Sequence, residues 1–344
     1  MTSEPRPTIV LPYRGESPSF RAAPHFCAPR TAVLGRASVG GGLILGARAT
    51  IRADGHHIRA GETFCLGPRS TIHIAHEINP TLVGDRVAVG ANVVLHACTI
   101  ADDVAVADDV VILDGSEVES HTIIAKGSIV FPRTRLDSGS LWAGLPARRV
   151  RALEAGEVEA ASRRIRAQSC SDEPGLPAGI DGRARVADCL FVAPTARIAG
   201  EVVADEAASI WFGCDIDAQL STITIGVRTN IQDNTEIFCP AGPVAIGSDC
   251  TIGHNVRLES CTVGDRSLIG NGAFVQAATI VEAGVLVAAG AITEPGQRLE
   301  SGWLWGGRPA RRLSALDAPR LRQIAAGAGH YLEYAAHFRA AATA

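Results

Sequence analysis

The chain has 344 residues, of which 47% are hydrophobic and 20% charged, and its formal net charge is −4. This length allows two domains of ordinary size, each with a real core. The small net charge, with no run of Lys or Arg longer than two residues, argues against a nucleic-acid partner or an anionic membrane surface. No apolar stretch is long enough to span a bilayer.

The nine cysteines are scattered and odd in number, and they include no Cys-x-x-Cys pair. The first residues also lack the apolar run of a secretory leader. Disulfides persist mainly in oxidising compartments, so this pattern predicts buried thiols and a cytoplasmic location.

The first 22 residues contain four of the 18 prolines among mixed polar residues. Proline removes a backbone donor and interrupts regular structure. We therefore expect residues 1–22 to be an extended N-terminal arm without secondary structure.

The first predicted domain, residues 23–170, is a six-residue repeat from residue 26 to residue 150 followed by a helix. In VGDRVAVGANVVLHACTI (residues 83–100) the recurring aliphatic residues are Val83, Val89 and Leu95. A period of six fits neither a helix nor an alternating strand. It is typical of a short strand plus a corner, three of which form one coil of a triangular solenoid with the aliphatic residues inside. Residues 153–166 are rich in helix formers and predict a helix along the outside.

The same organisation returns after a Pro/Gly/Ser-rich linker at residues 171–182. Within residues 183–344, IGSDCTIGHNVRLESCTV repeats the six-residue period, and SGWLWGGRPARRL matches SGSLWAGLPARRV of the first half at nine of thirteen positions. The chain is therefore a tandem duplication with a domain boundary near residue 175. A closing helix is expected over residues 317–342.

Four motifs of the second half carry a resemblance. SIWFG, TIGVRTNIQD and TIGHNVRLESCTVGD occur in this order, followed by WGGRPARRL and the expected helix. In order and spacing they resemble the gamma-class carbonic anhydrases and their relatives among the hexapeptide-repeat proteins. The resemblance implies an all-β solenoid: two tandem left-handed parallel β-helix prisms, each followed by a C-terminal α-helix.

The resemblance also implies a metal-dependent reaction. In that family a divalent metal, zinc or else iron or cobalt, lies between neighbouring prisms and is held by three histidines. Two of them come from one prism and one from the next. Three neutral imidazoles and an open coordination position lower the pKa of a bound water to about 7, which supplies hydroxide for attack on CO₂.

Neither half keeps all three ligand positions of the family. The second half has His254 at one of them, but Phe238 and Glu259 at the other two. In the first half, His96 stands at the position equivalent to Glu259, and Ala91 stands at the position equivalent to His254. Because the losses are complementary, the resemblance implies one site between unlike halves.

The remaining ligand from the first half is open between His76, His73 and Asn79. If Ile78 is taken as one of the recurring aliphatic residues, Asn79 stands at the position of the family's remaining histidine ligand. We favour His76, because Glu77 beside it could orient the imidazole.

Four further residues are implied as catalytic. The first half keeps the R-x-D of the family as Arg52 and Asp54, and the second half keeps Gln232 and Asp233, which we align with residues 73–74 of the first half. Arg52 and Asp233 could pair where unlike halves meet.

The other histidines predict no site. His56 and His57 are assigned to an insertion of about six residues that the second half lacks, and an exposed loop is expected there. Surface positions are expected for His121, His330 and His337.

Three functions follow as alternatives. The first is gamma-carbonic-anhydrase-like hydration of CO₂ to bicarbonate. The second is a metal-free assembly protein that has lost its chemistry. The third is a hexapeptide acyltransferase in which His254, or else His121, deprotonates an acceptor. Self-association into rings of three prisms is expected. Since two prisms cannot fill one ring, three chains forming two rings give the simplest closure.

Overall fold

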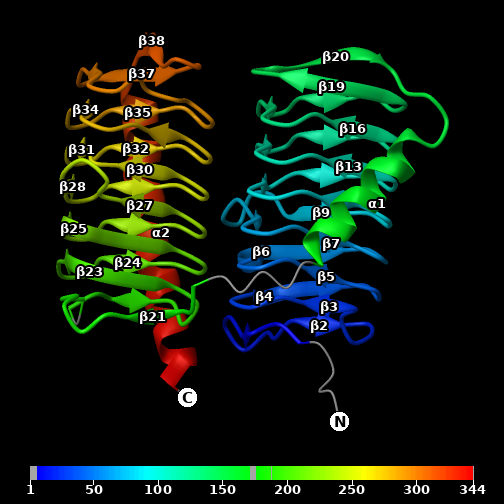
Figure 1. The fold of residues 1–344 in the computed structure, drawn as a ribbon, viewed down its shortest axis with the longest axis horizontal. Helices are drawn as coiled ribbons and strands as arrows, with labels where there is room; N and C mark the ends of the chain where they lie inside the picture. Colours follow the sequence, from blue (N-terminus) through cyan, green and yellow to red (C-terminus); the bar gives the residue numbers. More distant parts are fainter. Residues whose placement is uncertain (1–5, 171–175, 187, 344) are drawn as a thin grey trace. The chain divides into compact units, whose positions relative to one another are not determined.

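A computed structural model describes residues 6–170, 176–186 and 188–343 of the chain. The chain divides into two compact units, residues 1–175 and 176–344. We call their described parts prism one and prism two, and in each of them short strands stack coil upon coil (Figure 1). Residues 1–5 of the predicted arm and 171–175 of the predicted linker lie outside the described residues.

Prism one contains twenty strands and one helix: β1 (Ile9–Leu11), β2 (Ser19–Phe20), β3 (Phe26–Cys27), β4 (Ala32–Val39), β5 (Ile44–Leu45), β6 (Thr50–Ala60), β7 (Cys65–Leu66), β8 (Thr71–His73), β9 (Thr81–Val83), β10 (Ala88–Val89), β11 (Val94–His96), β12 (Thr99–Ile100), β13 (Val104–Val106), β14 (Val111–Ile112), β15 (Glu117–Val118), β16 (Thr122–Ile124), β17 (Ile129–Val130), β18 (Arg135–Leu136), β19 (Ser140–Gly144), β20 (Ala147–Ala152) and α1 (Glu157–Ser169).

Prism two contains eighteen strands and one helix: β21 (Gly179–Ile180), β22 (Phe191–Val192), β23 (Arg197–Ala204), β24 (Ser209–Ile210), β25 (Asp215–Ile225), β26 (Asn230–Ile231), β27 (Glu236–Phe238), β28 (Val244–Ile246), β29 (Thr251–Ile252), β30 (Arg257–Glu259), β31 (Thr262–Val263), β32 (Leu268–Ile269), β33 (Phe274–Val275), β34 (Ile280–Val281), β35 (Leu286–Val287), β36 (Arg298–Leu299), β37 (Trp303–Gly306), β38 (Arg311–Ala315) and α2 (Ala318–Thr343).

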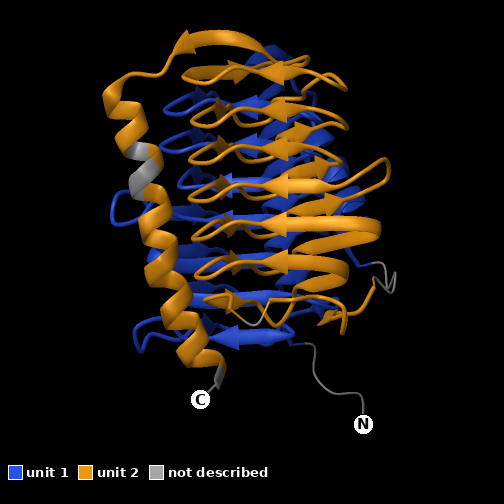
Figure 2. Ribbon diagram, turned by 90° about the vertical axis from the view of Figure 1, so that its left-hand side faces the viewer, with its two compact units in different colours: residues 1–175 blue, residues 176–344 orange. Residues whose placement is uncertain are grey.

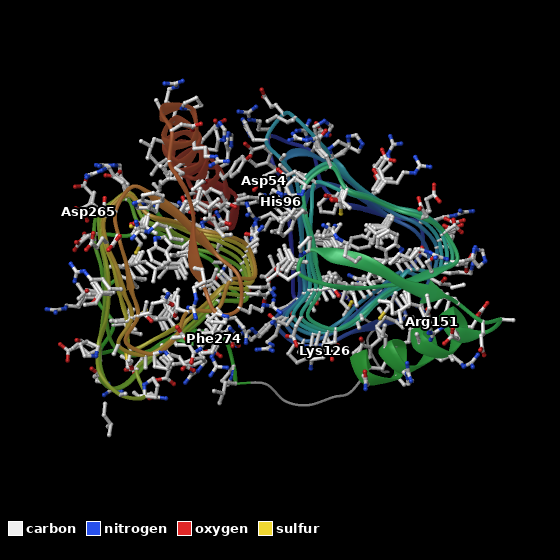
Figure 3. All side chains as sticks on the ribbon, turned by 90° about the horizontal axis from the view of Figure 1, so that it is seen from above. Asp54, His96, Lys126, Arg151, Asp265 and Phe274 are labelled. Atoms are coloured by element: carbon white, nitrogen blue, oxygen red, sulfur yellow. The ribbon has the colours of Figure 1, made fainter. Side chains whose placement is uncertain are left out.

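The coils of each prism are parallel and stack the same kind of residue in register. In prism one, Leu66 pairs with Val89 and Val89 with Val106 on one face. All three side chains are fully buried. Viewed along the stack, the apolar side chains fill the inside of each prism (Figure 3). Burial of this aliphatic column is the main force that selects the fold.

Two sheets form the three faces of prism one. One of them has the central order β17-β14-β11-β8-β6-β9-β12-β15-β18, and the other has the order β20-β19-β16-β13-β10-β7-β5-β3. The long strand β6 pairs with β8 through its first residues and with β9 through its last, so it bends around a corner. Prism two repeats this arrangement with β25, which pairs with β27 and with β28.

The sharp corners require a left-handed backbone. Asn92, Asp109 and Gly127 occupy one corner in successive coils, with φ of 56°, 59° and 71°. Asn, Asp and Gly tolerate this region best. The Asn92 amide also donates to Asp109 in the next coil, at 2.9 Å. The predicted fold class, two tandem left-handed β-helix prisms each followed by an α-helix, is confirmed.

The N-terminal arm differs from prediction. Strands β1 and β2 both pair in parallel with β4, so residues 9–20 form an additional coil, and the expectation of an arm without secondary structure is wrong there. The reason is that β4 would otherwise leave a row of unpaired backbone groups at the end of the prism.

The helix of prism one is shifted from its predicted range of 153–166. Residues 147–152 first return as β20, antiparallel to β19, and α1 begins after Gly156, whose φ is 83°. Its buried residues Val158, Ala161 and Ile165 pack on small side chains of the prism face. In prism two the equivalent helix α2 runs along the stacked coils of its own unit (Figure 2).

The predicted insertion at His56 and His57 is wrong. Strands β6 and β25 have the same length of eleven residues. The extra length of prism one lies in the loop between β8 and β9, which has seven residues (74–80), whereas the loop between β27 and β28 has five (239–243). An isolated bridge between Ala75 and Asn79 closes the longer loop.

None of the helices in the described part of the chain has the length and apolar character needed to cross a membrane. None of the nine cysteines, all of which lie in the described part of the chain, forms a disulfide, and seven of them are buried.

Candidate functional site

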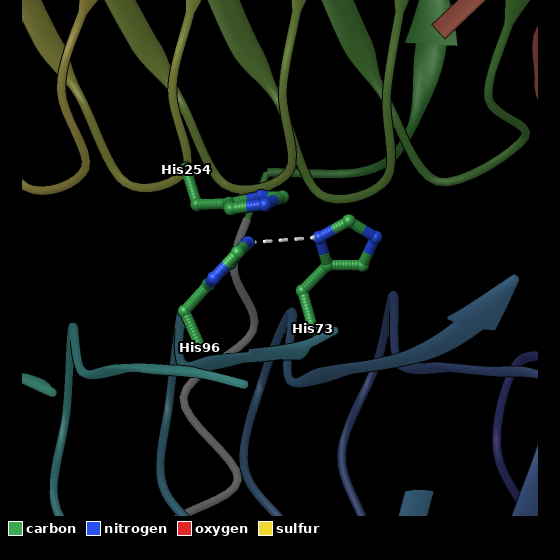
Figure 4. A group of neighbouring side chains, drawn as sticks. All are labelled: His73, His96 and His254. Atoms are coloured by element: carbon green, nitrogen blue, oxygen red, sulfur yellow. Dashed lines mark hydrogen bonds between the residues drawn. The ribbon is translucent and has the colours of Figure 1, made fainter. Parts of the chain in front are cut away.

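Two histidines of prism one stand side by side. His73 ends β8 and His96 ends β11, and the two residues are register partners in adjacent coils. Nδ1 of His73 lies 3.4 Å from Nε2 of His96 (Figure 4). His73 is 3% exposed and His96 is half-buried. Parallel stacking therefore brings together two imidazoles that are 23 residues apart in the sequence.

A carboxylate holds each imidazole from the opposite side. His73 Nε2 lies 2.9 Å from Asp54 Oδ1, and His96 Nδ1 lies 2.6 Å from Asp114 Oδ1. A carboxylate accepts hydrogen bonds, so the neutral rings carry their protons on these nitrogens. Arg52 pairs with the other oxygen of Asp54, and both residues are fully buried.

The facing nitrogens of the two rings are then both lone-pair acceptors. Two acceptors at 3.4 Å repel unless a proton or a metal cation lies between them. Zinc–nitrogen bonds of about 2.0–2.1 Å at a tetrahedral angle place two ligand nitrogens about 3.3–3.4 Å apart. The pair therefore fits two ligands of one tetrahedral divalent metal.

Asp114 was not among the site residues predicted from the sequence. This residue lies eighteen positions after His96, which is one coil of three hexapeptides, so the repeat itself carried the signal. Burial acts to raise the pKa of the Asp114 carboxyl, but its interaction with His96 and its backbone hydrogen bond outweigh burial and leave that pKa below its ordinary value. Asp114 is thus suited to remain a carboxylate beside His96.

A second half-site lies in prism two. His254 follows β29 at a corner and is fully buried. Its Nδ1 lies 3.1 Å from Asp233 Oδ2, while the other oxygen of Asp233 accepts from the Phe212 backbone at 3.1 Å. The His254 backbone donates to Asn271 at 3.0 Å. A carboxylate thus lies beside this ring as in prism one, but here the contact does not have the geometry of a hydrogen bond.

Helix α2 adds a residue that the sequence gave no reason to expect. The Tyr331 hydroxyl lies 3.5 Å from His254 Nε2. Its ring also contacts Trp211 edge-on, with centroids 5.1 Å apart. Of the other implied residues, Gln232 is buried and donates to Asn230 at 3.1 Å.

The structure corrects the register around the third ligand. His73, not His76 or Asn79, is the strand partner of His96. His76 lies half-buried in the 74–80 loop, where Ile78, which the six-residue count placed inside, is 74% exposed. The count failed because this loop leaves the coil between β8 and β9.

The alignment of Gln232 and Asp233 with residues 73–74 is also wrong. These two residues directly follow β26, which occupies in prism two the place of β7 in prism one. Their counterparts are therefore Gly67 and Pro68, six residues earlier than predicted. A slip of six residues leaves a period-six pattern unchanged, so the pattern could not detect it.

In prism two, other residues stand at the positions equivalent to His73 and His96. Phe238 and Glu259 are register partners, as His73 and His96 are in prism one. Arg257 pairs with Glu259 and lies 6.0 Å from the Phe238 ring centroid.

The remaining predicted residues are scattered. His121 is exposed, and His330 and His337 are half-buried on α2. His56 and His57 are half-buried within β6, so the expectation of an exposed loop is wrong for them.

The proposed pairing of Arg52 with Asp233 stays a prediction. Within its own unit, each of the two has another partner. Arg52 pairs with Asp54, and Asp233 lies beside His254.

Comparison with known proteins finds the same repeat in other proteins. The family model for the hexapeptide repeat of succinyl-transferase matches residues 243–277. A solved structure, the hexapeptide transferase family protein from Anaplasma phagocytophilum, is 34% identical, with a TM-score of 0.41, covering 46% of this chain and 90% of that one. Repeat, coil and corner define the chain as a hexapeptide-repeat β-helix protein.

Sequence relatives narrow the class. The chain is 35% identical over 157 residues to the carbonic anhydrase of Geobacillus kaustophilus, covering 45% of this chain and 86% of that protein. It is 38% identical over 148 residues to the mitochondrial gamma carbonic anhydrase 1 of Arabidopsis thaliana, covering 41% of this chain and 54% of that protein. The chain belongs to the gamma carbonic anhydrase-like family. It spans about half the length of the Arabidopsis relatives that it matches.

Proposed function

We propose that this protein is a gamma-carbonic-anhydrase-like enzyme that interconverts CO₂ and bicarbonate at a divalent metal, with zinc as the first candidate. The observation that carries the proposal is the pair of carboxylate-held imidazoles in prism one, whose facing nitrogens are 3.4 Å apart. The proposed ligands are His73 and His96 of prism one and His254 of a prism two, because His254 occupies the family position at which prism one has no histidine.

The chain's own residues would prepare this site before the metal binds. Asp54 and Asp114 would fix the proton on the outer nitrogens of His73 and His96, and Asp233 lies beside Nδ1 of His254. Arg52 compensates the buried charge of Asp54. When bound, a divalent metal would supply a Lewis acid that lowers the pKa of a bound water toward about 7.

The proposed site needs one prism of each kind, in one chain or in neighbouring chains. We propose rings of three prisms, in which a pair from prism one is completed by His254 from a prism two. With two prisms per chain, three chains forming two rings give the simplest closed assembly.

Metal analysis and CO₂ hydration kinetics test the proposal on the purified full chain. We expect one zinc, iron or cobalt per complete site and hydration activity that a chelator abolishes. His73→Ala and His254→Ala should each lose most of the metal and the activity, while His121→Ala, an exposed histidine of prism one, should lose neither.

Other outcomes would redirect the assignment. If His76→Ala removed the metal and His73→Ala did not, the loop histidine would be the ligand. A well-folded protein without metal or hydration activity would support the assembly-protein alternative. Retention on immobilised coenzyme A together with acyl transfer that His254→Ala abolishes would support the acyltransferase alternative.

A further inference from the structure

A hollow of about 340 Å³ opens on the outside of prism one, beside strand β6. Its basic lining comes from two adjacent strands: Arg36 from β4, and His57 and Arg59 from β6. Between these residues, Ala37 and Ile58 are register partners and are fully buried. Because successive residues of a strand point to opposite faces, the three basic side chains lie together on the outer face.

The positive charge of this hollow is not compensated within the described part of the chain, where neither Arg36 nor Arg59 forms an ion pair. Arg36 donates from Nη2 to the Asp54 carbonyl at 3.5 Å, and its buried Nε has no hydrogen-bond partner there. Glu16 also lines the hollow, but it is exposed and forms no ion pair with the described residues. An unpaired, half-buried guanidinium is costly unless an anion neutralises it.

His57 is affected by the same charges. Burial lowers its pKa most, and the charges of His56, Arg59 and Arg36 lower it further. His56 Nδ1 accepts from the His57 backbone at 2.9 Å, so the two rings are held close together. A negative ligand in the hollow would raise the pKa of His57, against the lowering effect of the two arginines.

Prism two provides an internal comparison. At the same register positions it carries Glu201, Thr222 and Thr224 in place of Arg36, His57 and Arg59. The duplicated coil is therefore complete without these basic side chains, and the shared fold does not explain them.

We propose that this hollow binds a small oxyanion of the bicarbonate or phosphate type between the guanidiniums of Arg36 and Arg59 and the ring of His57. Planar guanidiniums match the geometry of such oxygens and form charge-assisted hydrogen bonds with them. None of the three residues is a proposed metal ligand, so the proposal stands apart from the metal site.

NMR of the full chain labelled with ¹⁵N-histidine tests this site. Sodium bicarbonate and sodium phosphate are titrated separately, with chloride used to hold the ionic strength constant, and the His57 resonances are assigned by His57→Gln. We expect saturable shifts and a rise in the pKa of His57 at saturation. The anion that saturates the shifts at the lower concentration is the preferred ligand of the hollow. Repeating the bicarbonate arm in His96→Ala separates this result from turnover at the metal.

A matched variant carries the residues of prism two. Arg36→Glu with Arg59→Thr should weaken binding about tenfold or more, because it removes two charge-assisted contacts. Arg135→Gln, an exposed arginine of the same prism that pairs with Glu119, should leave binding unchanged. If the double variant does not fold, Arg59→Thr alone serves, because Arg59 is exposed. Shifts that grow linearly without saturation, or equal affinity in the variant and its control, would overturn the proposal.

Discussion

The two prisms have the same coil but present different side chains at equivalent strand ends. In prism one these residues are His73 and His96, each held by a carboxylate. In prism two they are Phe238 and Glu259, and Arg257 contacts both. The interior column is aliphatic in either case. The comparison teaches that burial inside the coil maintains the fold, so the outward residues at the strand ends are free to gain or lose chemistry.

The helices differ in a similar way. In prism one, α1 packs aliphatic residues such as Ile165 on Cys65, Ala88 and Ala105. In prism two, α2 packs Phe338 into an aromatic cluster, with centroid distances of 6.0 Å to Trp211 and 5.8 Å to Phe212. The α2 contact also includes Tyr331 beside His254. Among the residues that the structure describes, it is therefore α2 whose packing reaches a candidate ligand.

The largest difference between the prisms should appear at the ligand positions. We expect His96→Ala to reduce CO₂ hydration by more than about 100-fold and to remove the metal, because one of three ligands is lost. Glu259→Ala, at the equivalent position of prism two, should change neither. Metal analysis and stopped-flow hydration assays measure both effects. Equal losses in the two variants would mean that prism two also contributes this position to the site.

The next largest difference should appear in helix packing. Phe338→Ala should destabilise prism two by about 3–5 kcal/mol, because a fully buried aromatic side chain leaves a cavity. Ile165→Ala should destabilise prism one by about 2 kcal/mol, since its neighbours are small and Ile165 is 8% exposed. Chemical denaturation followed by tryptophan fluorescence measures the two transitions. Similar losses in both variants would show that aromatic packing gives α2 no advantage.

A smaller effect is expected from the carboxylate behind His96. Asp114→Ala should weaken metal binding about 10–100-fold, because the imidazole loses its orienting acceptor. Asp109→Ala, which removes an acidic corner residue that bonds Asn92, should leave metal affinity unchanged. Competition with a chromogenic chelator compares the two variants. An unchanged affinity in Asp114→Ala would mean that His96 is positioned by packing alone.

Most of the fold could be predicted from the sequence, because a six-residue aliphatic period and a long internal duplication leave few other architectures. The ends of the repeat were less predictable. The pairing of residues 9–20 with β4 depends on strand edges that no local pattern reveals. The first helix begins later than predicted because β20 first pairs antiparallel with β19, and this pairing also depends on a strand edge.

The residues of the candidate site could be placed only in part from the sequence. His96 and His254 follow from motif positions, but the choice among His73, His76 and Asn79 depended on where the extra residues of prism one leave the coil. A period-six pattern is identical after a slip of six, so the sequence could not locate that loop. The backbone resolves it, with the 74–80 loop closed by the bridge from Ala75 to Asn79.

The smallest expected difference concerns the cysteines. Prism two has five, all buried, whereas prism one has two buried and two half-buried. Burial raises the pKa of Cys261 to about 12 and that of Cys65 to about 11, so at pH 8 these thiols remain almost entirely protonated. Only a thiolate reacts rapidly with a disulfide reagent.

Native protein at pH 8 should therefore label slowly, and first in prism one. Burial also raises the pKa of Cys27 to about 12, which leaves Cys170 as the expected first site. Mass spectrometry after a timed reaction, with fully denatured protein as the control in which all nine thiols react, gives the order of labelling. Rapid labelling of any thiol of prism two would show that its coils open under native conditions, against the expectation from their burial.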